Sequence, residues 1–279
     1  MPVRIVQSSQ NSRLKLLRRA LASPTREAGA LAGIEGPNLL TEALRARLRI
    51  PTVFVALGAE ELLDGLAVPD GTEILALPKG LLNAALTTET PQPVAALVEP
   101  FDWIWRDLFE SFDSPVQPLV VVLAGIQEPG NLGTILRSAE AFGATGVVSL
   151  PGTVSAWNPK AVRASAGSVF RVPLIAANAE KCFAVLRQYG VRSLTTAVSG
   201  ACPADRADLT SPVALFIGNE GNGVPADLAA RTDGAVTIRC PGPVESLNAA
   251  VAAGVLLYEA SRQRAACVSA PSNRGGAHR

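Results

Sequence analysis

The first hundred residues consist of short apolar blocks separated by polar and glycine-containing turns. Leucines recur at helical spacing within residues 11–22, which predicts a short helix that Asn11 or Ser12 can cap. A second helix is predicted after the Gly-Pro turn in GIEGPNLLTEALRAR. Apolar, β-branched runs predict two strands, at 51–57 and 73–77, and a further apolar run follows at 94–98. These alternating elements predict a small α/β domain over residues 1–100.

The second half has longer apolar runs that alternate with helical patterns. PLVVVLAG, at 118–125, is continuously apolar, as in strands that are buried on both faces of a parallel sheet. Helices are predicted at 132–142, 180–189 and 246–264, and further strands at 145–150, 192–198, 213–218 and 235–239. Because strands alternate with helices, we predict a parallel sheet with helices on its faces, in a domain that spans 118–265.

Two further segments flank this domain. Residues 99–118 are acidic, bounded by proline, and contain two of the three tryptophans. Aromatic residues at this density favour burial, so we predict a helical connector at 101–117 that packs on one domain rather than a flexible linker. The residues after 265 are rich in Ser, Pro, Gly and Asn, which predicts a disordered tail at 266–279.

The charge is uneven along the chain, although the net charge is only +1. Residues 1–50 hold nine Arg or Lys against three Glu, whereas residues 51–115 hold two basic against eleven acidic groups. One face of the first predicted helix carries Arg13, Lys15, Arg18 and Arg19. This asymmetry predicts a polyanionic partner near the N-terminus; the alternative is a solvated helix face.

Several classes of site are disfavoured by composition. The one histidine, His278, lies in the tail, which argues against histidine-dependent triads and zinc proteases. The four cysteines have spacings that match no zinc site, so no metal is expected. Their pattern is typical of a protein in a reducing cytoplasm. The N-terminus lacks the apolar run of a signal peptide, and no apolar stretch is long enough to span a membrane.

Three loops that follow predicted strands carry the candidate chemistry, because ligands of open α/β sheets bind at the carboxyl ends of strands. They are GIQEPGNLG, LFIGNEGNGVP and CPGPVESLN. The first lacks the GxGxxG of dinucleotide sites and the lysine of a P-loop. Taken singly, two of the loops have a structural alternative: the second could be a plain turn, and Ser246 in the third a helix cap.

Taken together and in order, these segments resemble the motifs of the SpoU (TrmH-like) RNA ribose 2′-O-methyltransferases of the SPOUT superfamily. NLGTILRSAEAFGA, RASAGSVFRVP, LFIGNEGNGVP and VESLNAAVAAGVLLYEA are similar to the family's successive motifs, over residues 120–264. GIEGPNLLTEAL and TTETPQPVAALV resemble segments of its N-terminal substrate-binding domain. Ile34 and Pro93 stand where the family commonly has Val and Gly.

The resemblance implies an α/β fold with a trefoil knot in a C-terminal SPOUT sheet, preceded by a small ribosomal protein L30e-like α/β domain. It implies a homodimer whose active site is completed across the interface, and S-adenosylmethionine bound within the knot. The implied catalytic residues are Asn131, Arg137, Glu220, Ser246 and Asn248. The implied cofactor-binding residues are Thr196, Gly218, Glu220, Gly221, Ile238, Leu247 and Asn248. Arg163 joins Arg13, Lys15, Arg18 and Arg19 as an expected RNA contact, with a structural ion pair as its alternative.

The family assigns the role of base to the arginine that matches Arg137. Because a guanidinium stays protonated at neutral pH, the other role for Arg137 is to orient the 2′-hydroxyl and stabilise the developing alkoxide. We expect Asn131 to position Arg137 or the ribose, and Glu220 to orient Arg137. The sequence thus predicts an AdoMet-dependent 2′-O-methyltransferase acting on 23S rRNA. The alternatives are a tRNA methyltransferase, a non-catalytic RNA-binding protein of the same fold, and an NAD-dependent oxidoreductase.

Overall fold

The computed structural model describes residues 3–23, 29–110, 117–219, 221–244 and 246–269 of the chain. By their contacts, the residues fall into two compact units that are each discontinuous in sequence. The first unit comprises residues 1–103, 127–137 and 154–172, and the second comprises the remaining segments.

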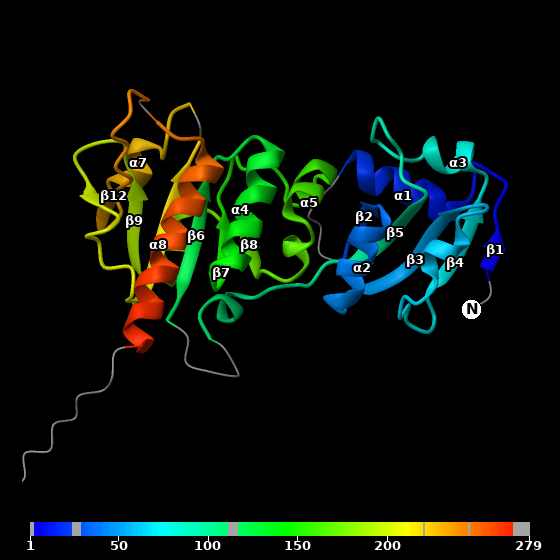
Figure 1. Ribbon diagram of the computed structural model, residues 1–279, viewed down its shortest axis with the longest axis horizontal. Helices are drawn as coiled ribbons and strands as arrows, with labels where there is room; N and C mark the ends of the chain where they lie inside the picture. The colour runs from blue at the N-terminus through cyan, green and yellow to red at the C-terminus, as the bar shows by residue number, and fades with distance from the viewer. Residues whose placement is uncertain (1–2, 24–28, 111–116, 220, 245, 270–279) are drawn as a thin grey trace, which may run out of the picture. The chain divides into compact units, whose positions relative to one another are not determined.

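The first unit is built on a five-stranded mixed sheet (Figure 1). Its strands run in the order β1-β4-β3-β5-β2, with β1, β3 and β4 parallel and β5 antiparallel to both β3 and β2. The strands are β1 (Val3–Ile5), β2 (Ala32–Glu35), β3 (Arg49–Ala56), β4 (Glu73–Leu77) and β5 (Val94–Glu99). The helices around them are α1 (Ser12–Ala22), α2 (Pro37–Arg45), α3 (Lys79–Asn83) and the 3₁₀ turn η1 (Glu60–Leu63).

Helix α1 forms for the reasons that the sequence indicates. The side chain of Asn11 accepts hydrogen bonds from the backbone N–H groups of Arg13 and Leu14, so Asn11 caps the helix. Leu14 and Leu17 are fully buried in the core between α1 and the sheet. The predicted helix and the predicted cap are therefore confirmed, and the basic residues of α1 lie around this buried stripe.

Segments 127–137 and 154–172 complete the first unit. They contain most of α4 (Pro129–Ala141), all of α5 (Pro159–Ser165) and the 3₁₀ turn η3 (Ser168–Phe170). Helix α5 contacts strand β2. These segments are distant in sequence from the rest of the unit, so their packing was not predictable from local patterns.

The second unit contains a seven-stranded sheet in the order β10-β12-β9-β11-β6-β7-β8, in which all neighbours are parallel. The strands are β6 (Leu119–Ala124), β7 (Gly146–Ser149), β8 (Leu174–Ala176), β9 (Arg192–Thr196), β10 (Cys202–Pro203), β11 (Val213–Gly218) and β12 (Gly234–Thr237). The helices and turns are α6 (Ala179–Gln188), α7 (Ala226–Ala229), α8 (Ala249–Ser269) and η2 (Trp105–Leu108). The predicted parallel sheet is confirmed.

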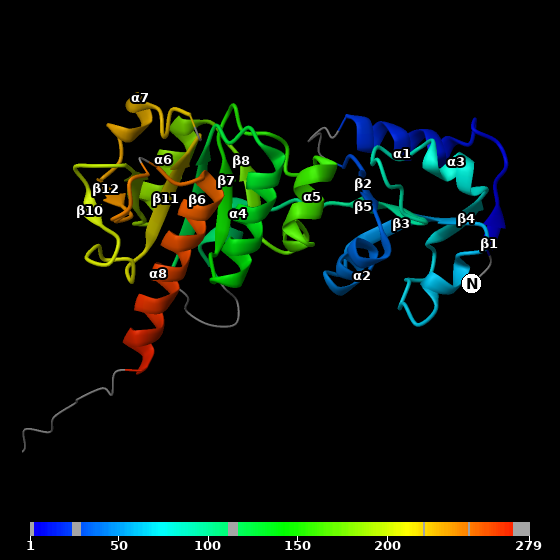
Figure 2. The same cartoon turned by 45° about the horizontal axis from the view of Figure 1, so that its top comes forward.

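Helices cover both faces of this sheet (Figure 2). Phe216 of β11 packs with Phe183 of α6 in the core of one face, where the two rings stack at 5.1 Å. Helix α8 also contacts β11, and the neighbouring residue Ile217 lines a cavity with Leu256 of α8. Because successive strand residues point to opposite faces, α6 and α8 lie on opposite sides of the sheet.

The segment expected to be a helical connector forms only the short 3₁₀ turn η2 within its described residues. The predicted burial holds for part of its aromatic residues: Phe109 is buried and stacks on Tyr189 at 4.3 Å, and Trp105 packs against the same core. Phe101 is exposed, contrary to the prediction. Helix α8 begins at Ala249 rather than at residue 246, and it extends through residues 266–269, which the sequence analysis assigned to the tail. The rest of that tail lies outside the described residues.

Candidate functional site

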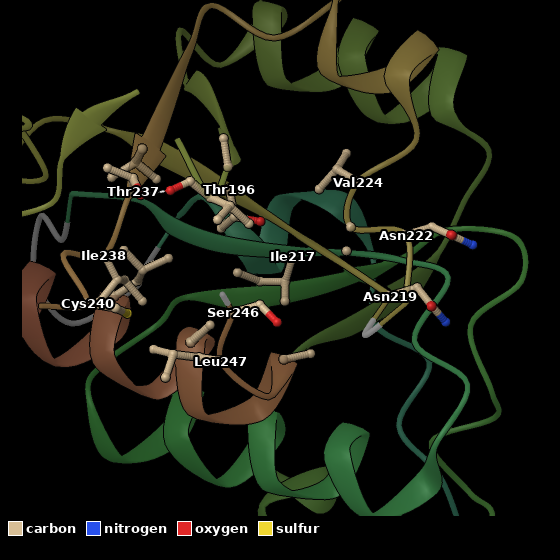
Figure 3. Close-up of a pocket in the computed structure, with 18 of the residues that line it drawn as sticks. Thr196, Ile217, Asn219, Asn222, Val224, Thr237, Ile238, Cys240, Ser246 and Leu247 are labelled. Atoms are coloured by element: carbon tan, nitrogen blue, oxygen red, sulfur yellow. Dashed lines mark hydrogen bonds between the residues drawn. The ribbon is translucent and has the colours of Figure 1, made fainter. Parts of the chain in front are cut away.

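A cavity of about 980 Å³ opens at the carboxyl ends of β9, β11 and β12 in the second unit. Figure 3 shows its arrangement: Ile217, Ser246 and Leu247 lie between two walls. One wall carries Asn219, Asn222 and Val224, and the other carries Thr196, Thr237 and Ile238. This is the edge of the sheet at which the sequence analysis placed the candidate loops.

The residues between the two walls and those of the second wall combine apolar side chains with polar groups that are hydrogen-bonded to backbone carbonyls. Ile217, Leu247 and Leu256 supply apolar surface. The Thr196 hydroxyl donates to the carbonyl of Phe216 at 3.0 Å, and the Thr237 hydroxyl donates to the carbonyl of Val198 at 3.2 Å. Such a cavity favours a ligand with a flat apolar part whose polar edges meet backbone groups.

The first wall is a tight glycine loop that follows β11. The backbones of Asn219 and Gly223 exchange two hydrogen bonds, at 3.1 and 2.9 Å. A Cβ atom on Gly218 would overlap the backbone of Gly223 and Val224, so only glycine fits there. The Asn219 side chain accepts from the N–H of Gly221 at 2.8 Å and donates to the carbonyl of Gly125 at 3.1 Å. Asn219 thereby fixes this loop to the loop that follows β6.

Of the residues predicted to bind the cofactor, Thr196, Gly218, Gly221, Ile238 and Leu247 line this cavity. Glu220 lies outside the described residues. Asn219 was not predicted, although it stands in the same motif, because its role depends on a contact with residue 125 that sequence spacing does not reveal.

The two predicted residues near the start of α8 have different surroundings. The side chain of Asn248 accepts from the N–H groups of Ala250 at 2.9 Å and Val251 at 3.3 Å, so Asn248 caps the helix. Ser246 is exposed and lines the cavity. The alternative interpretation of Ser246 as the cap is therefore wrong, because Asn248 occupies that position.

The remaining predicted site residues belong to the first unit. Asn131 and Arg137 lie on α4, and Arg163 lies on α5. The side chains of Arg137 and Arg163 are exposed, and that of Asn131 is half-buried. Arg137 was predicted within an otherwise apolar helix; the structure places it on the exposed side of that helix.

The basic residues of α1 are not equivalent. Arg13 donates to Glu73 at 3.2 Å, and Arg4 also pairs with Glu73. The Nε atom of Arg18 is buried and has no hydrogen-bond partner among the described residues. Lys15 and Arg19 are exposed. Of the four basic residues expected to meet RNA, Lys15 and Arg19 are the most exposed, whereas Arg13 is held in an ion pair.

The described cysteines differ in their surroundings. Burial raises the pKa of the Cys182 thiol to about 12, so this thiol is not a nucleophile at neutral pH. Cys240 is exposed at the cavity. No group of three or more His, Cys, Asp or Glu side chains suited to a metal ion occurs among the described residues, and no described helix is both long and apolar enough to cross a membrane.

Comparison with known proteins identifies the family. The model of the SpoU rRNA methylase family matches residues 118–258, and a model described as RNA 2′-O ribose methyltransferase substrate binding matches residues 34–103. This chain belongs to the SpoU family of RNA 2′-O-ribose methyltransferases. The resemblance drawn from the sequence motifs is therefore confirmed, and the cavity lies within the part matched by the methylase model.

Relatives of this SpoU-family chain cover nearly all of it. The 23S rRNA (guanosine(2553)-2′-O)-methyltransferase RlmP of Bacillus subtilis is 31% identical over 91% of this chain and 97% of its own length. The structure of AdoMet-bound rRNA methyltransferase from Sinorhizobium meliloti is similar with a TM-score of 0.80, 30% identity, and coverage of 94% of this chain and 98% of that one. The SpoU methyltransferase AviRb from Streptomyces viridochromogenes, in complex with AdoMet, has a TM-score of 0.78, 29% identity, and coverage of 92% and 99%. The predicted α/β fold is thus confirmed.

Proposed function

We propose that this SpoU methyltransferase transfers a methyl group from S-adenosylmethionine to the ribose 2′-oxygen of a nucleotide in 23S rRNA. The observation that carries the proposal is the cavity at the carboxyl ends of β9, β11 and β12, built by a glycine loop of the family's sequence. The similarity to RlmP, which is named for a guanosine of 23S rRNA, supports ribosomal RNA as the substrate. We infer that the reaction takes place in the cytoplasm.

The cavity fits this cofactor in size and in chemistry. About 980 Å³ lies in the upper part of the range usual for pockets that hold ligands of this size. Ile238 and Leu247 would contact the adenine, and backbone groups of Gly218 and Gly221 would meet the polar edges. When bound, S-adenosylmethionine supplies an electrophilic methyl group on a sulfonium. Thr196 and Asn248 serve the site through the strand end and the helix start that they stabilise.

The chain itself must orient and activate the ribose hydroxyl. Arg137, whose side chain is exposed, holds the 2′-oxygen and stabilises the negative charge that develops there as the proton passes to solvent water. Asn131, in the first turn of the same helix, positions Arg137 or the ribose. Glu220 orients Arg137 and balances its charge, and Ser246 contacts substrate from the cavity rim. Positioning the oxygen in line with the leaving group supplies much of the rate.

A homodimer is part of the proposal, with the active site completed across the interface and the cofactor held in a knotted segment. Helix α8 exposes Val251, Val255 and Tyr258, with exposed fractions of 52, 39 and 55%. These positions follow helical spacing and form one apolar stripe. Phe142 extends the stripe, since its ring meets that of Tyr258 edge-on at 5.7 Å. An apolar stripe of this kind supports burial against a second copy.

Mapping of 2′-O-methyl groups tests the proposal. RNA from cells with and without the gene is digested and analysed by mass spectrometry, and the missing site is restored in vitro with purified protein and S-adenosylmethionine. We expect one ribose methyl in 23S rRNA to depend on the gene. Loss of a tRNA site instead would favour the alternative suggested by relatives named tRNA/rRNA methyltransferases, such as that of Mycolicibacterium vanbaalenii, which is 35% identical. No change in any ribose methyl would contradict the proposal.

A further inference from the structure

An ion pair joins the substrate-binding region of the first unit to the segment that carries α5. Arg171 donates from Nη1 to the Oε2 atom of Glu42, on α2, at 2.7 Å. The two side chains are only 32% and 23% exposed, and 129 positions separate them in sequence. Glu42 also accepts from Arg45 at 2.6 Å, which holds its carboxylate in place. The contact is therefore preorganised and partly shielded from water.

A glycine brings the same segment directly against α2. Gly167 has a φ of +88°, and a Cβ atom there would lie 2.6 Å from the Cβ of Glu42. Ala166, the preceding residue, is also left-handed, with a φ of 49°. A side chain at 167 would have both a strained backbone and a clash. The turn at the end of α5 therefore packs directly against Glu42, the residue that binds Arg171.

Helix α5 in turn packs closely on the first turns of α4. A Cβ atom on Gly133 would lie 2.6 Å from the Cβ of Ala164 and 2.8 Å from the backbone nitrogen of Ser165. Lys160, at the start of α5, pairs with Glu128, just before α4, at 2.6 Å. Close backbone approach and an ion pair therefore hold the two helices together at neighbouring points.

The contacted turns of α4 are those that carry the proposed catalytic groups. Gly133 lies two residues after Asn131 and four residues before Arg137. Residues four apart lie on the same side of a helix. A shift of α5 relative to α4 would therefore be felt on the side of α4 that carries Arg137, and Asn131 lies within one turn of the contact.

We infer that Glu42 and Arg171 are positioning residues that fix α4, and with it Asn131 and Arg137, to the substrate-binding region. This inference rests on the proposed function. These contacts fix the position of RNA, held by the substrate-binding region, relative to Asn131 and Arg137. The contacts run from Glu42 to Arg171 and Gly167, then through α5 to Gly133. Neither Glu42 nor Arg171 touches the reacting atoms.

The pair acts on rate more than on stability. A partly exposed ion pair contributes little to the free energy of unfolding, but displacement of a catalytic group by about 1 Å can cost on the order of a hundredfold in rate. Loss of the charge on either partner should leave the protein folded. It should allow α4 to move relative to the substrate-binding region.

Glu42→Gln, Arg171→Gln and the double variant test the inference in the full-length protein. Glu42→Gln keeps the side-chain shape against Gly167 and removes only the charge. Glu99→Gln is the matched control, because Arg49 and Glu99 form an ion pair of the same 2.7 Å length within the five-stranded sheet. The assay measures kcat and KM for target RNA, the Kd for S-adenosylmethionine, and amide hydrogen exchange of residues 129–141.

We expect each single variant to lower kcat by about tenfold, with unchanged cofactor affinity and an RNA KM within about twofold of wild type. The double variant should lose no more than the worse single variant. Exchange in α4 should rise in Glu42→Gln and stay at the wild-type level in Glu99→Gln.

Several results would overturn the inference: an unchanged kcat in both single variants, additive losses in the double variant, an equal loss in Glu99→Gln, or a rise in RNA KM alone. If the wild-type protein methylates no RNA, the proposed function fails, and the exchange comparison between Glu42→Gln and Glu99→Gln still decides whether the contact holds α4.

Discussion

The two compact units present their chemistry in different ways. In the second unit, the cavity is lined largely by backbone, glycine and apolar side chains, and the side chains of Thr196, Asn219 and Thr237 donate hydrogen bonds to backbone carbonyls. In the first unit, the candidate groups are the side chains Asn131, Arg137 and Arg163, displayed on two helices. We therefore propose that the shape of a loop recognises the cofactor, whereas individual side chains meet the RNA. The two regions should respond to substitution in opposite ways.

The largest expected effect is that of Arg137→Ala. Loss of one contact that stabilises developing charge costs on the order of 10² or more in rate, so methyl transfer should fall at least that far. The fold and the affinity for S-adenosylmethionine should stay near wild type, since Arg137 is exposed. Arg137→Lys should fail as well, because an ammonium does not reproduce the planar fork.

Single-turnover methyl transfer measures the effect, and Arg187→Ala, an exposed arginine of α6, is the control. Activity of Arg137→Ala within a few-fold of wild type would remove Arg137 from the site.

Gly218→Ala should act in the opposite way, on cofactor binding. The added Cβ overlaps the backbone of Gly223 and Val224, so the loop must move. Overpacking of this kind costs about 1–3 kcal/mol, which corresponds to a rise in Kd of roughly 5- to 150-fold if the cost falls on the bound state. Calorimetry with S-adenosylmethionine measures the Kd, and thermal unfolding shows whether the variant remains folded.

Gly242→Ala is the matched control in the loop before α8, because nothing lies within 4 Å of its added Cβ. Equal affinities of the two variants would mean that the loop after β11 does not shape the site.

A smaller effect is expected on the basic face of α1. Lys15 and Arg19 are exposed, whereas Arg13 is engaged by Glu73. Each lost phosphate contact lowers the salt slope of RNA binding by somewhat less than one unit. Lys15→Gln/Arg19→Gln should therefore flatten the slope by less than two units and leave cofactor affinity unchanged. Arg13→Gln alone should change the slope less than Lys15→Gln alone or Arg19→Gln alone. A wild-type slope in the double variant would identify the face as merely solvated.

The smallest effect is expected for variants of Asn248, which distinguish capping of α8 from contact with substrate or cofactor. Asn248→Ala removes the cap of α8 and should lower the free energy of unfolding by about 1 kcal/mol. Asn248→Asp keeps the cap and should keep the stability. If Asn248 also contacts substrate or cofactor, Asn248→Asp should lose activity at wild-type stability. Full activity in a stable Asn248→Asp would leave capping as its role.

The sequence predicted those parts of the molecule that depend on local pattern. Helix α1 with its Asn11 cap and strands β4 and β11 appear where apolar periodicity placed them. Short edge strands such as β8 and β10 were missed, because two or three residues carry too little pattern. The start of α8 was misplaced because both Ser246 and Asn248 are good cap residues, and only the structure shows which side chain meets the free N–H groups.

The same distinction, between features set by local sequence and features set by tertiary contacts, holds for the site. The cavity residues Gly218, Ile238 and Leu247 were predicted from the resemblance to the family, which can be followed along continuous segments of the chain. The link between Asn219 and Gly125, and the pair between Glu42 and Arg171, join positions 94 and 129 residues apart. Such contacts are products of the tertiary fold, so no local reading of the chain contains them.

The most direct test of the central claim uses two target RNAs that differ by one oxygen. The first is the 23S rRNA fragment that contains the mapped nucleotide, and the second carries a 2′-deoxyribose at that nucleotide alone. Purified protein and S-adenosylmethionine with a labelled methyl group are incubated with each. The account predicts stoichiometric labelling of the ribose in the first RNA and none in the second. Equal labelling of both RNAs, with the methyl group on the base, would contradict it.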